Sequence, residues 1–113
     1  MAVVVTQSGS QTCTVTTEHT VTTTVNTAGT YVFKVDLNAS VNGDAFEVRV
    51  KCKARAADTA RVIYFETFAN VQDDPIKIGA PCAIAVNEAL DCSIKQTTGT
   101  SRAVPWNLLQ IDS

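Results

Sequence analysis

The chain has 113 residues, of which 45% are hydrophobic and 18% are charged, and its formal net charge is −2. This length suggests one domain, large enough to bury a core without a metal or disulfides, and a charge content below the usual ~25% is typical of a surface that a partner covers. The acidic balance, with a pI near 5.2, argues against nucleic acid as the main partner, and the chain lacks the run of about 18 apolar residues that would span a membrane.

Residues 1–12 have the composition of a loose N-terminal arm, because they are small and polar apart from three consecutive valines. Val3, Val4 and Val5 could add this arm to the edge of a sheet. The start of the chain lacks the basic segment of a signal peptide, so we expect the protein to be used without secretory processing.

Threonine dominates residues 12–30, and this β-branched residue favours strands. We expect strands near 12–17 and 20–25, followed by a turn at the sequence NTAG. Apolar and polar residues then alternate over 31–37, and Asn42-Gly43 in the loop 38–44 is the strongest turn signal of the chain.

The next strand, 45–55, alternates almost perfectly, with apolar residues and Cys52 on one face and charged residues on the other. After a short connection at 56–59, residues 60–71 are apolar on both faces near Ile63–Phe65, which is typical of a central strand. Residues 72–81 are predicted to be a loop. Strands are expected near 82–87, 90–96 and 104–111, the last two joined by a hairpin at 96–102, and a helical turn at 85–92 stays open.

Seven to nine short strands with turn signals between them indicate an all-β fold. We predict a single antiparallel β-sandwich over residues 13–113, Ig-like or jelly-roll-like, preceded by the flexible arm 1–12.

The four cysteines, Cys13, Cys52, Cys82 and Cys92, contain no C-x-x-C pair, which disfavours zinc. Two readings stay open: buried thiols, or disulfides that form after release into an oxidising environment. Cys52 is expected to face the core. If a disulfide exists, Cys52 and Cys92 are its expected partners, because both share inward parity with core residues.

Residues suited to catalysis are scarce. His19 is the sole histidine, and its neighbour Glu18 should point to the opposite face of a strand. Asp73 and Asp74 lack the spacing of a calcium loop and are expected to cap a solvated turn. We therefore predict no catalytic, cofactor-binding or metal-binding residues and no enzyme activity.

The chain has one concentrated charge feature, a basic row on the face of the strand 45–55 opposite its apolar face. It consists of Arg49, Lys51, Lys53 and Arg55. Such a row is either a solvated outer face that discourages edge aggregation or an electrostatic contact with an acidic partner. The expected partner contacts are thus this row together with Val3, Val4 and Val5.

Two stretches, VDLNASVNGDAFEVRVKCKARAADTARVIYFETFANVQDDP at 35–75 and LDCSIKQTTGTSRAVPWNLLQI at 90–111, resemble small all-β virion structural proteins of tailed bacteriophages. The similar features are a strand running into a DLN turn, then NGD-F-E-RV, and a final K-TGT-R hairpin with a tryptophan. Residues 1–30 match poorly, as a variable arm would. The four cysteines depart from the pattern and leave open a covalently reinforced variant.

The resemblance implies a capsid decoration or cement protein that binds the major capsid protein and stabilises the shell through subunit contacts and arm exchange. It implies a homo-oligomer, with a trimer as the first expectation, located in the virion after assembly in the host bacterial cytoplasm. The alternative is a host- or glycan-binding module of a head fibre or tail. A small enzyme built around His19 is the third possibility.

Overall fold

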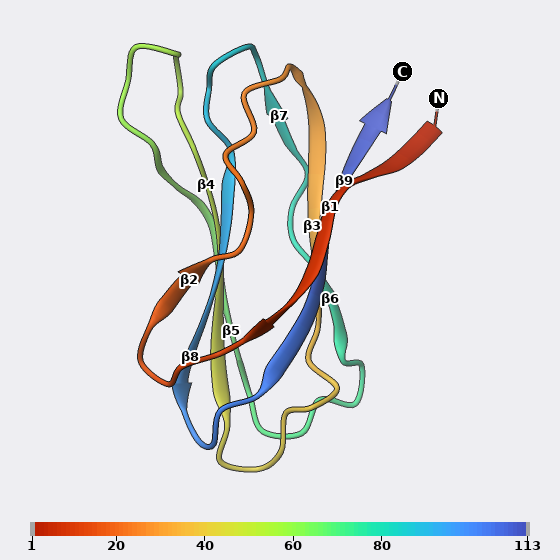
Figure 1. The fold of residues 1–113 in the computed structure, drawn as a ribbon, viewed down its shortest axis with the longest axis vertical. Coiled ribbons are helices and arrows are strands. Elements are labelled where there is room, and N and C mark those ends of the chain that lie inside the picture. The colour runs from red at the N-terminus through yellow and green to blue at the C-terminus, as the bar shows by residue number, and fades with distance from the viewer. Residues whose placement is uncertain (1, 113) are drawn as a thin grey trace.

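The computed structural model describes residues 2–112 and shows two antiparallel sheets packed face to face (Figure 1). The strands within that range are β1 (Ala2–Thr12), β2 (Glu18–Thr20), β3 (Gly29–Asp36), β4 (Ala45–Cys52), β5 (Arg61–Ala69), β6 (Ile76–Ile78), β7 (Cys82–Ile84), β8 (Asp91–Thr98) and β9 (Ala103–Asp112). The predicted all-β sandwich of seven to nine strands is confirmed. Among residues 2–112, no helix is long and apolar enough to cross a membrane.

The two sheets are called sheet A and sheet B here. Sheet A has the order β1-β9-β3-β6, with β7 also pairing with β3, and sheet B has the order β2-β8-β4-β5. The two ends of the chain are therefore neighbouring strands, β1 and β9, and they lie at the same end of the sandwich in Figure 1.

The core lies between the sheets because side chains alternate along the long strands. β3 supplies Tyr31, Phe33 and Val35, and β4 supplies Phe46 and Val48, each at most 3% exposed. This alternation of β3 and β4 is what the sequence predicts. It places the residues between the buried ones, most of which are polar, on the outer surfaces of the two sheets.

The threonine-rich segment forms less strand than expected. Only β2 and an isolated bridge between Val25 and Leu90 occur there, in place of strands at 12–17 and 20–25. Threonine hydroxyls explain the difference, because they take hydrogen bonds that a strand would make through its backbone. The Thr22 hydroxyl accepts from the Cys92 N–H at 3.0 Å, and the Thr24 hydroxyl donates to Asp91 at 3.0 Å.

The prediction that residues 60–71 form a central strand is wrong, since β5 is the last strand of sheet B. Ile63 and Phe65 are 50% and 48% exposed. Tyr64 and Phe68 on the inner face of β5 pack partly against the core, whereas Ile63 and Phe65 stay exposed. A bulge opposite Val50 and Lys51 also interrupts the register of β5 with β4.

Two connections also differ from expectation. The predicted loop 72–81 contains the short strand β6, whose Ile76 and Ile78 pair with β3. Val86 and Asn87 form a turn, and no helix occurs between residues 85 and 92.

Residues 2–12, expected as a loose arm, form β1, which pairs with β9 from Ala2 to Thr12 with one register shift between Val5 and Gln7. The first buried residue after it is Cys13, which is 1% exposed. The division between an arm and a sandwich domain stays a prediction.

Candidate interaction surface

β1 is a long edge strand with an unusual composition. None of its eleven residues is charged, and all except Gln7 and Gln11 are exposed. Val3, Val4 and Val5 are 61%, 45% and 58% exposed. Edge strands in soluble proteins are generally protected by charge or proline or are kept short, because their free N–H and C=O groups can pair with another chain. β1 has none of these three protections.

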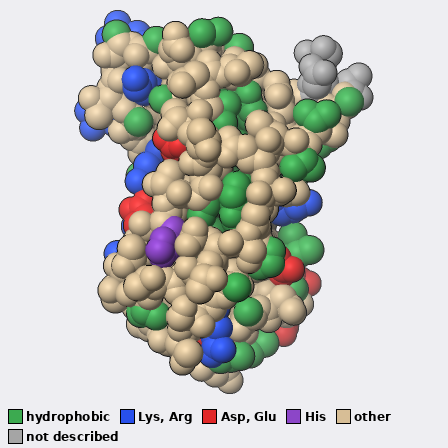
Figure 2. All heavy atoms as spheres, viewed as in Figure 1, with side chains coloured by type: hydrophobic (Ala, Val, Ile, Leu, Met, Phe, Trp, Pro, Cys, Tyr) green, Lys and Arg blue, Asp and Glu red, His purple; other side chains and the backbone are tan. Residues whose placement is uncertain are grey.

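The apolar character of β1 continues across the outer face of sheet A. Val3 lies opposite Ile111, and Val5 lies opposite Leu109, which in turn faces Val32 of β3. These side chains share one face because directly paired residues of an antiparallel sheet point to the same side. Figure 2 shows hydrophobic side chains along this side of the molecule. We call these five residues the outer strip.

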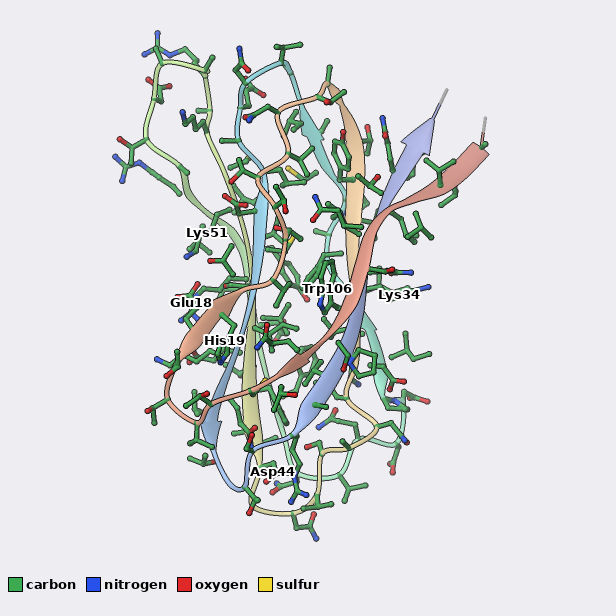
Figure 3. All side chains as sticks on the ribbon, viewed as in Figure 1. Glu18, His19, Lys34, Asp44, Lys51 and Trp106 are labelled. Atoms are coloured by element: carbon green, nitrogen blue, oxygen red, sulfur yellow. The ribbon has the colours of Figure 1, made fainter. Side chains whose placement is uncertain are left out.

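A shallow hollow of about 210 Å³ adjoins the outer strip on the same face. Ser8, Lys34, Asp36, Pro105 and Asn107 lie around it, and Ile76 of β6 borders it with 56% of its surface exposed. In Figure 3, Lys34 points away from the sandwich while Trp106 lies between the sheets. Accordingly, Trp106 packs against Phe33, with ring centroids 6.1 Å apart. The one tryptophan is therefore not an exposed platform for a ligand.

Few side-chain contacts hold β1 to the rest of the domain. The Gln7 amide donates to the Thr23 carbonyl and accepts from the Thr23 N–H, both at 2.8 Å. Gly9 lies against the Trp106 ring, where an added Cβ would be 3.3 Å from the indole. No residue of β1 belongs to the buried core of residues 2–112. The strand is thus held mainly by its backbone pairing with β9.

The expected basic row on the strand 45–55 is shorter than predicted, because β4 ends at Cys52 and Arg55 lies in the bend after it. Its charges are also paired with neighbours. Arg49 pairs with Glu47 at 2.8 Å, Lys51 with Glu18 at 2.7 Å, and Arg55 with Asp58 at 2.9 Å. The Lys53 ammonium donates to the Ala56 carbonyl at 3.4 Å.

Two further contacts tie the row to its surroundings. The pKa of Glu18 lies below its ordinary value, first because Lys51 donates a hydrogen bond to it and then because Ser93 does. The Arg49 guanidinium lies 4.7 Å from the Phe65 ring centroid. The positive charges are therefore engaged within the protein, and this face offers an acidic partner less than the sequence implies.

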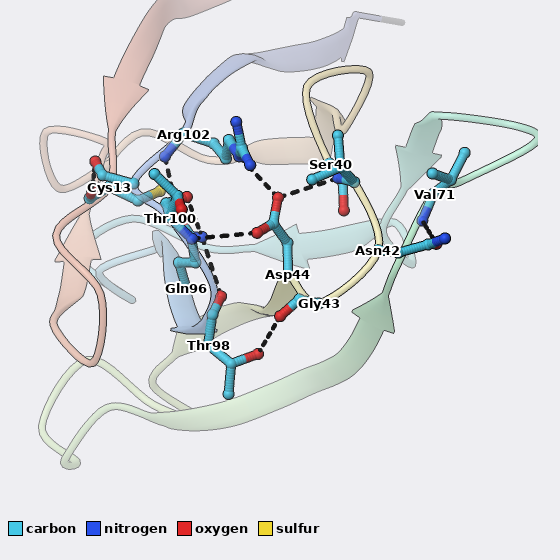
Figure 4. Close-up of polar contacts among 12 residues, drawn as sticks. Cys13, Ser40, Asn42, Gly43, Asp44, Val71, Gln96, Thr98, Thr100 and Arg102 are labelled. Carbon is cyan, nitrogen blue, oxygen red and sulfur yellow. Dashed lines mark hydrogen bonds and ion pairs between the residues drawn. The ribbon is translucent and has the colours of Figure 1, made fainter.

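A buried polar cluster joins the loop before β4 to the hairpin between β8 and β9 (Figure 4). The Asp44 carboxylate, 2% exposed, accepts hydrogen bonds from the Arg102 Nε at 2.8 Å, the Val41 N–H at 3.0 Å and the Thr100 N–H at 3.3 Å. Burial by itself would raise the pKa of Asp44, but these bonds outweigh burial and leave that pKa below its ordinary value.

The neighbouring Gln96 side chain, fully buried, completes this cluster. It donates to the Thr98 and Thr100 carbonyls and accepts from the Arg102 N–H. The cluster fixes the two loops against each other, and its polar groups are occupied by one another.

The residues considered for catalysis take structural positions. His19 Nε2 accepts a hydrogen bond from the Thr14 N–H at 3.0 Å, which ties β2 to the turn before it. Asp73 and Asp74 lie in the exposed turn before β6. Within residues 2–112, no group of three or more His, Cys, Asp or Glu side chains is placed to hold a metal ion.

All four cysteines are free thiols. Cys92 is 1% exposed, and Cys52 packs against the core from its edge, on the inner face of β4 as expected. The thiol in contact with Cys52 is that of Cys82, with a separation of 3.7 Å, whereas parity along the strands favoured Cys92.

Sequence reasoning missed several residues of this surface. The sequence places Ile76 and Ile78 in a predicted loop, although the alternation in IKI is a signal for a short strand. Leu109 and Ile111 were recognised as strand residues, but nothing in the local sequence says which of their faces is covered.

No family model matches the chain, and neither a curated protein nor a solved structure matches it.

Proposed function

We propose that the protein is a non-enzymatic virion structural protein of a tailed bacteriophage, a decoration or cement protein that binds the outside of the capsid and stabilises it. The observation that carries the proposal is the uncharged edge strand β1 together with the outer strip beside it. The resemblance of residues 35–75 and 90–111 to small all-β phage proteins supports the same assignment.

The chemistry of this surface suits a permanent contact with another protein. An open edge strand can extend the sheet of a partner through backbone hydrogen bonds, and those bonds require no particular side chains. The outer strip adds apolar area, and burial of each valine or leucine contributes on the order of 1.5–3 kcal/mol. The proposed occupant is the major capsid protein of the same particle, which presents a strand or loop to β1.

We also propose that the protein is a homo-oligomer, with a trimer as the first expectation. β1 supports this in two ways. It can meet another copy without like-charge repulsion, because it has no charge, and it can leave its own β9 for that of a neighbour without withdrawing any buried residue of its own from the core. Such an exchange would join the subunits on the shell. The particle would acquire the protein in the bacterial cytoplasm and carry it in the virion.

The experiment is co-sedimentation of the purified protein with capsids that lack it. The test variant is Val3→Glu/Val5→Glu, which places two carboxylates in the outer strip at positions 61% and 58% exposed. The control is Val86→Glu, which makes the same chemical change at an equally exposed position, 61%, in the turn after β7.

We expect wild type and Val86→Glu to bind alike, while the double variant loses roughly tenfold or more in affinity, the equivalent of about 1.4 kcal/mol. Wild type and Val86→Glu should unfold at similar temperatures, since the altered side chain is exposed. The double variant should keep a single cooperative transition, lowered only by the loss of subunit association. Wild-type protein that fails to bind capsids would overturn the function. Equal binding by all three proteins would overturn the proposal that the outer strip contacts the capsid.

The oligomeric state is tested by light scattering during gel filtration. The trimer predicts three times the chain mass of 12.0 kDa. The double glutamate variant should run at a lower mass than wild type. A wild-type monomer at all concentrations would contradict this part of the proposal.

A further inference from the structure

We propose that Cys52 and Cys82 form a disulfide between the two sheets when the protein enters an oxidising environment. Cys52 is the last residue of β4 in sheet B, and Cys82 is the first residue of β7 in sheet A. Their sulfur atoms are 3.7 Å apart, in contact but not bonded. A disulfide needs a separation of about 2.05 Å, so side-chain rotation and a small strand shift must close about 1.7 Å.

The two thiols differ in their exposure to solvent, and this difference determines which of them reacts first with an oxidant. Cys52 is half-buried and lines an open hollow under the connection between β4 and β5, together with Lys53 and Arg61. Cys82 is 7% exposed. A small anionic disulfide of the glutathione class can therefore reach Cys52 beside two cations, and it cannot reach Cys82 in the same way.

The reaction is thiol–disulfide exchange in two steps. The Cys52 thiolate attacks one sulfur of the small disulfide, whose S–S bond breaks, and one small thiolate leaves with a mixed disulfide on Cys52. Cys82 then loses its proton and attacks the Cys52 sulfur, and the second small thiolate leaves. Two electrons pass from the protein thiols to the small disulfide, and the two thiol protons end on the two released thiolates.

The second step is the slow one. In the reduced protein, burial above all, then the hydrogen bond to Cys52 and the negative charges of Cys52 and Glu88, together raise the pKa of Cys82 to about 12. The mixed disulfide removes the contributions of Cys52, but burial and Glu88 still raise this pKa above its ordinary value. Cys82 is therefore a thiol near neutral pH and must lose its proton as the step proceeds. Contact with Cys52 compensates, because attack within one molecule needs no encounter.

The cross-link would stabilise a part of the molecule with few buried residues, because Gly79 is the one buried residue between the two cysteines. The two cysteines are 30 positions apart, and the closed loop contains β5 and β6. Closing a loop of that size restricts the unfolded chain, and for a domain this small it should raise Tm by roughly 10 °C. Thiols would prevail in the cytoplasm and the disulfide outside it. This inference does not depend on what the protein binds.

The test uses the purified full-length protein, reduced, freed of reductant and incubated with oxidised glutathione. Thiols are counted in denaturant, and the bridge is located by mass spectrometry of peptides. We expect two of the four thiols to disappear, one bridged peptide pair containing Cys52 and Cys82, and a rise in Tm that dithiothreitol reverses.

Variants make the assignment specific. Cys52→Ala and Cys82→Ala should each abolish the bridge and the rise in Tm, whereas Cys13→Ala should keep both. Four thiols remaining after oxidation of wild type would overturn the proposal, and so would a bridge to Cys92. Because the count is made on wild type, a variant that fails to fold leaves the test decisive.

Discussion

Asp44→Asn tests the buried cluster that fixes the loops of the sandwich, and its effect can be worked out from the contacts of the carboxylate. In wild type one oxygen accepts from Arg102 and Val41, and the other accepts from Thr100. An asparagine has one oxygen and one NH₂ group. The less damaging orientation keeps the oxygen toward Arg102 and Val41 and turns the NH₂ group toward the Thr100 N–H.

In that orientation the variant loses one hydrogen bond and the charge assistance of the bond to Arg102. A neutral bond contributes about 1 kcal/mol and a charge-assisted bond up to about twice as much, so we expect the free energy of unfolding to fall by about 2–3 kcal/mol. For a domain near this size the corresponding fall in Tm is roughly 10 °C.

The assay is urea unfolding followed by tryptophan fluorescence, since Trp106 packs in the core. The midpoint should fall by roughly 1–2 M urea. Asp73→Asn is the matched control, because this exposed carboxyl should change stability by less than about 0.5 kcal/mol. Combining Asp44→Asn with Arg102→Gln should cost less than the sum of the single changes, because the residues interact directly. An Asp44→Asn protein as stable as the control would refute the assigned role of the cluster.

Three further predictions concern stability. The free energy of unfolding should fall on acidification below about pH 4. The pKa values of Asp44 and Glu18 are lower in the folded state than the ordinary value near 4, so protonation favours the unfolded chain. Acid unfolding curves that leave stability constant down to pH 2 would contradict this. Asp91→Asn should leave stability at pH 7 unchanged or slightly increased, because burial raises the pKa of Asp91 and its charged form is disfavoured; a loss comparable with that of Asp44→Asn would show the sign to be wrong. Gly99→Ala should lower the free energy of unfolding by about 2 kcal/mol or more, since φ is +98° and the added Cβ would overlap the Asp44 carboxylate; unchanged thermal unfolding would exclude that overlap.

The sequence predicts the interior of this protein better than its edges. The alternation of residues 31–37 and 45–52 identifies two of the strands that build the core, because each buries one face. β5 is the exception, because its apolar residues on both faces are typical of a central strand, whereas pairing between distant segments places it at the end of sheet B.

The candidate surface also combines features that the local sequence predicts with features that depend on pairing between distant segments. The three valines of β1 were recognisable as a possible edge contact, because an uncharged apolar run near a terminus is unusual. Their alignment with Leu109 and Ile111 was not, since it depends on the register of β1 against β9. The contact between Cys52 and Cys82 joins opposite sheets, so parity within a strand could identify Cys52 as inward-facing but could not choose its neighbour.

The proposed function requires that a tailed phage encodes this chain, and its most direct test is quantitative mass spectrometry of purified virions of that phage, with the copy number measured against the major capsid protein. A decoration protein predicts a fixed ratio to the capsid protein that survives repeated purification, with many copies in each particle. Absence from the particles would contradict a virion role, and a few copies in each particle would contradict capsid decoration and place the protein in a tail or fibre.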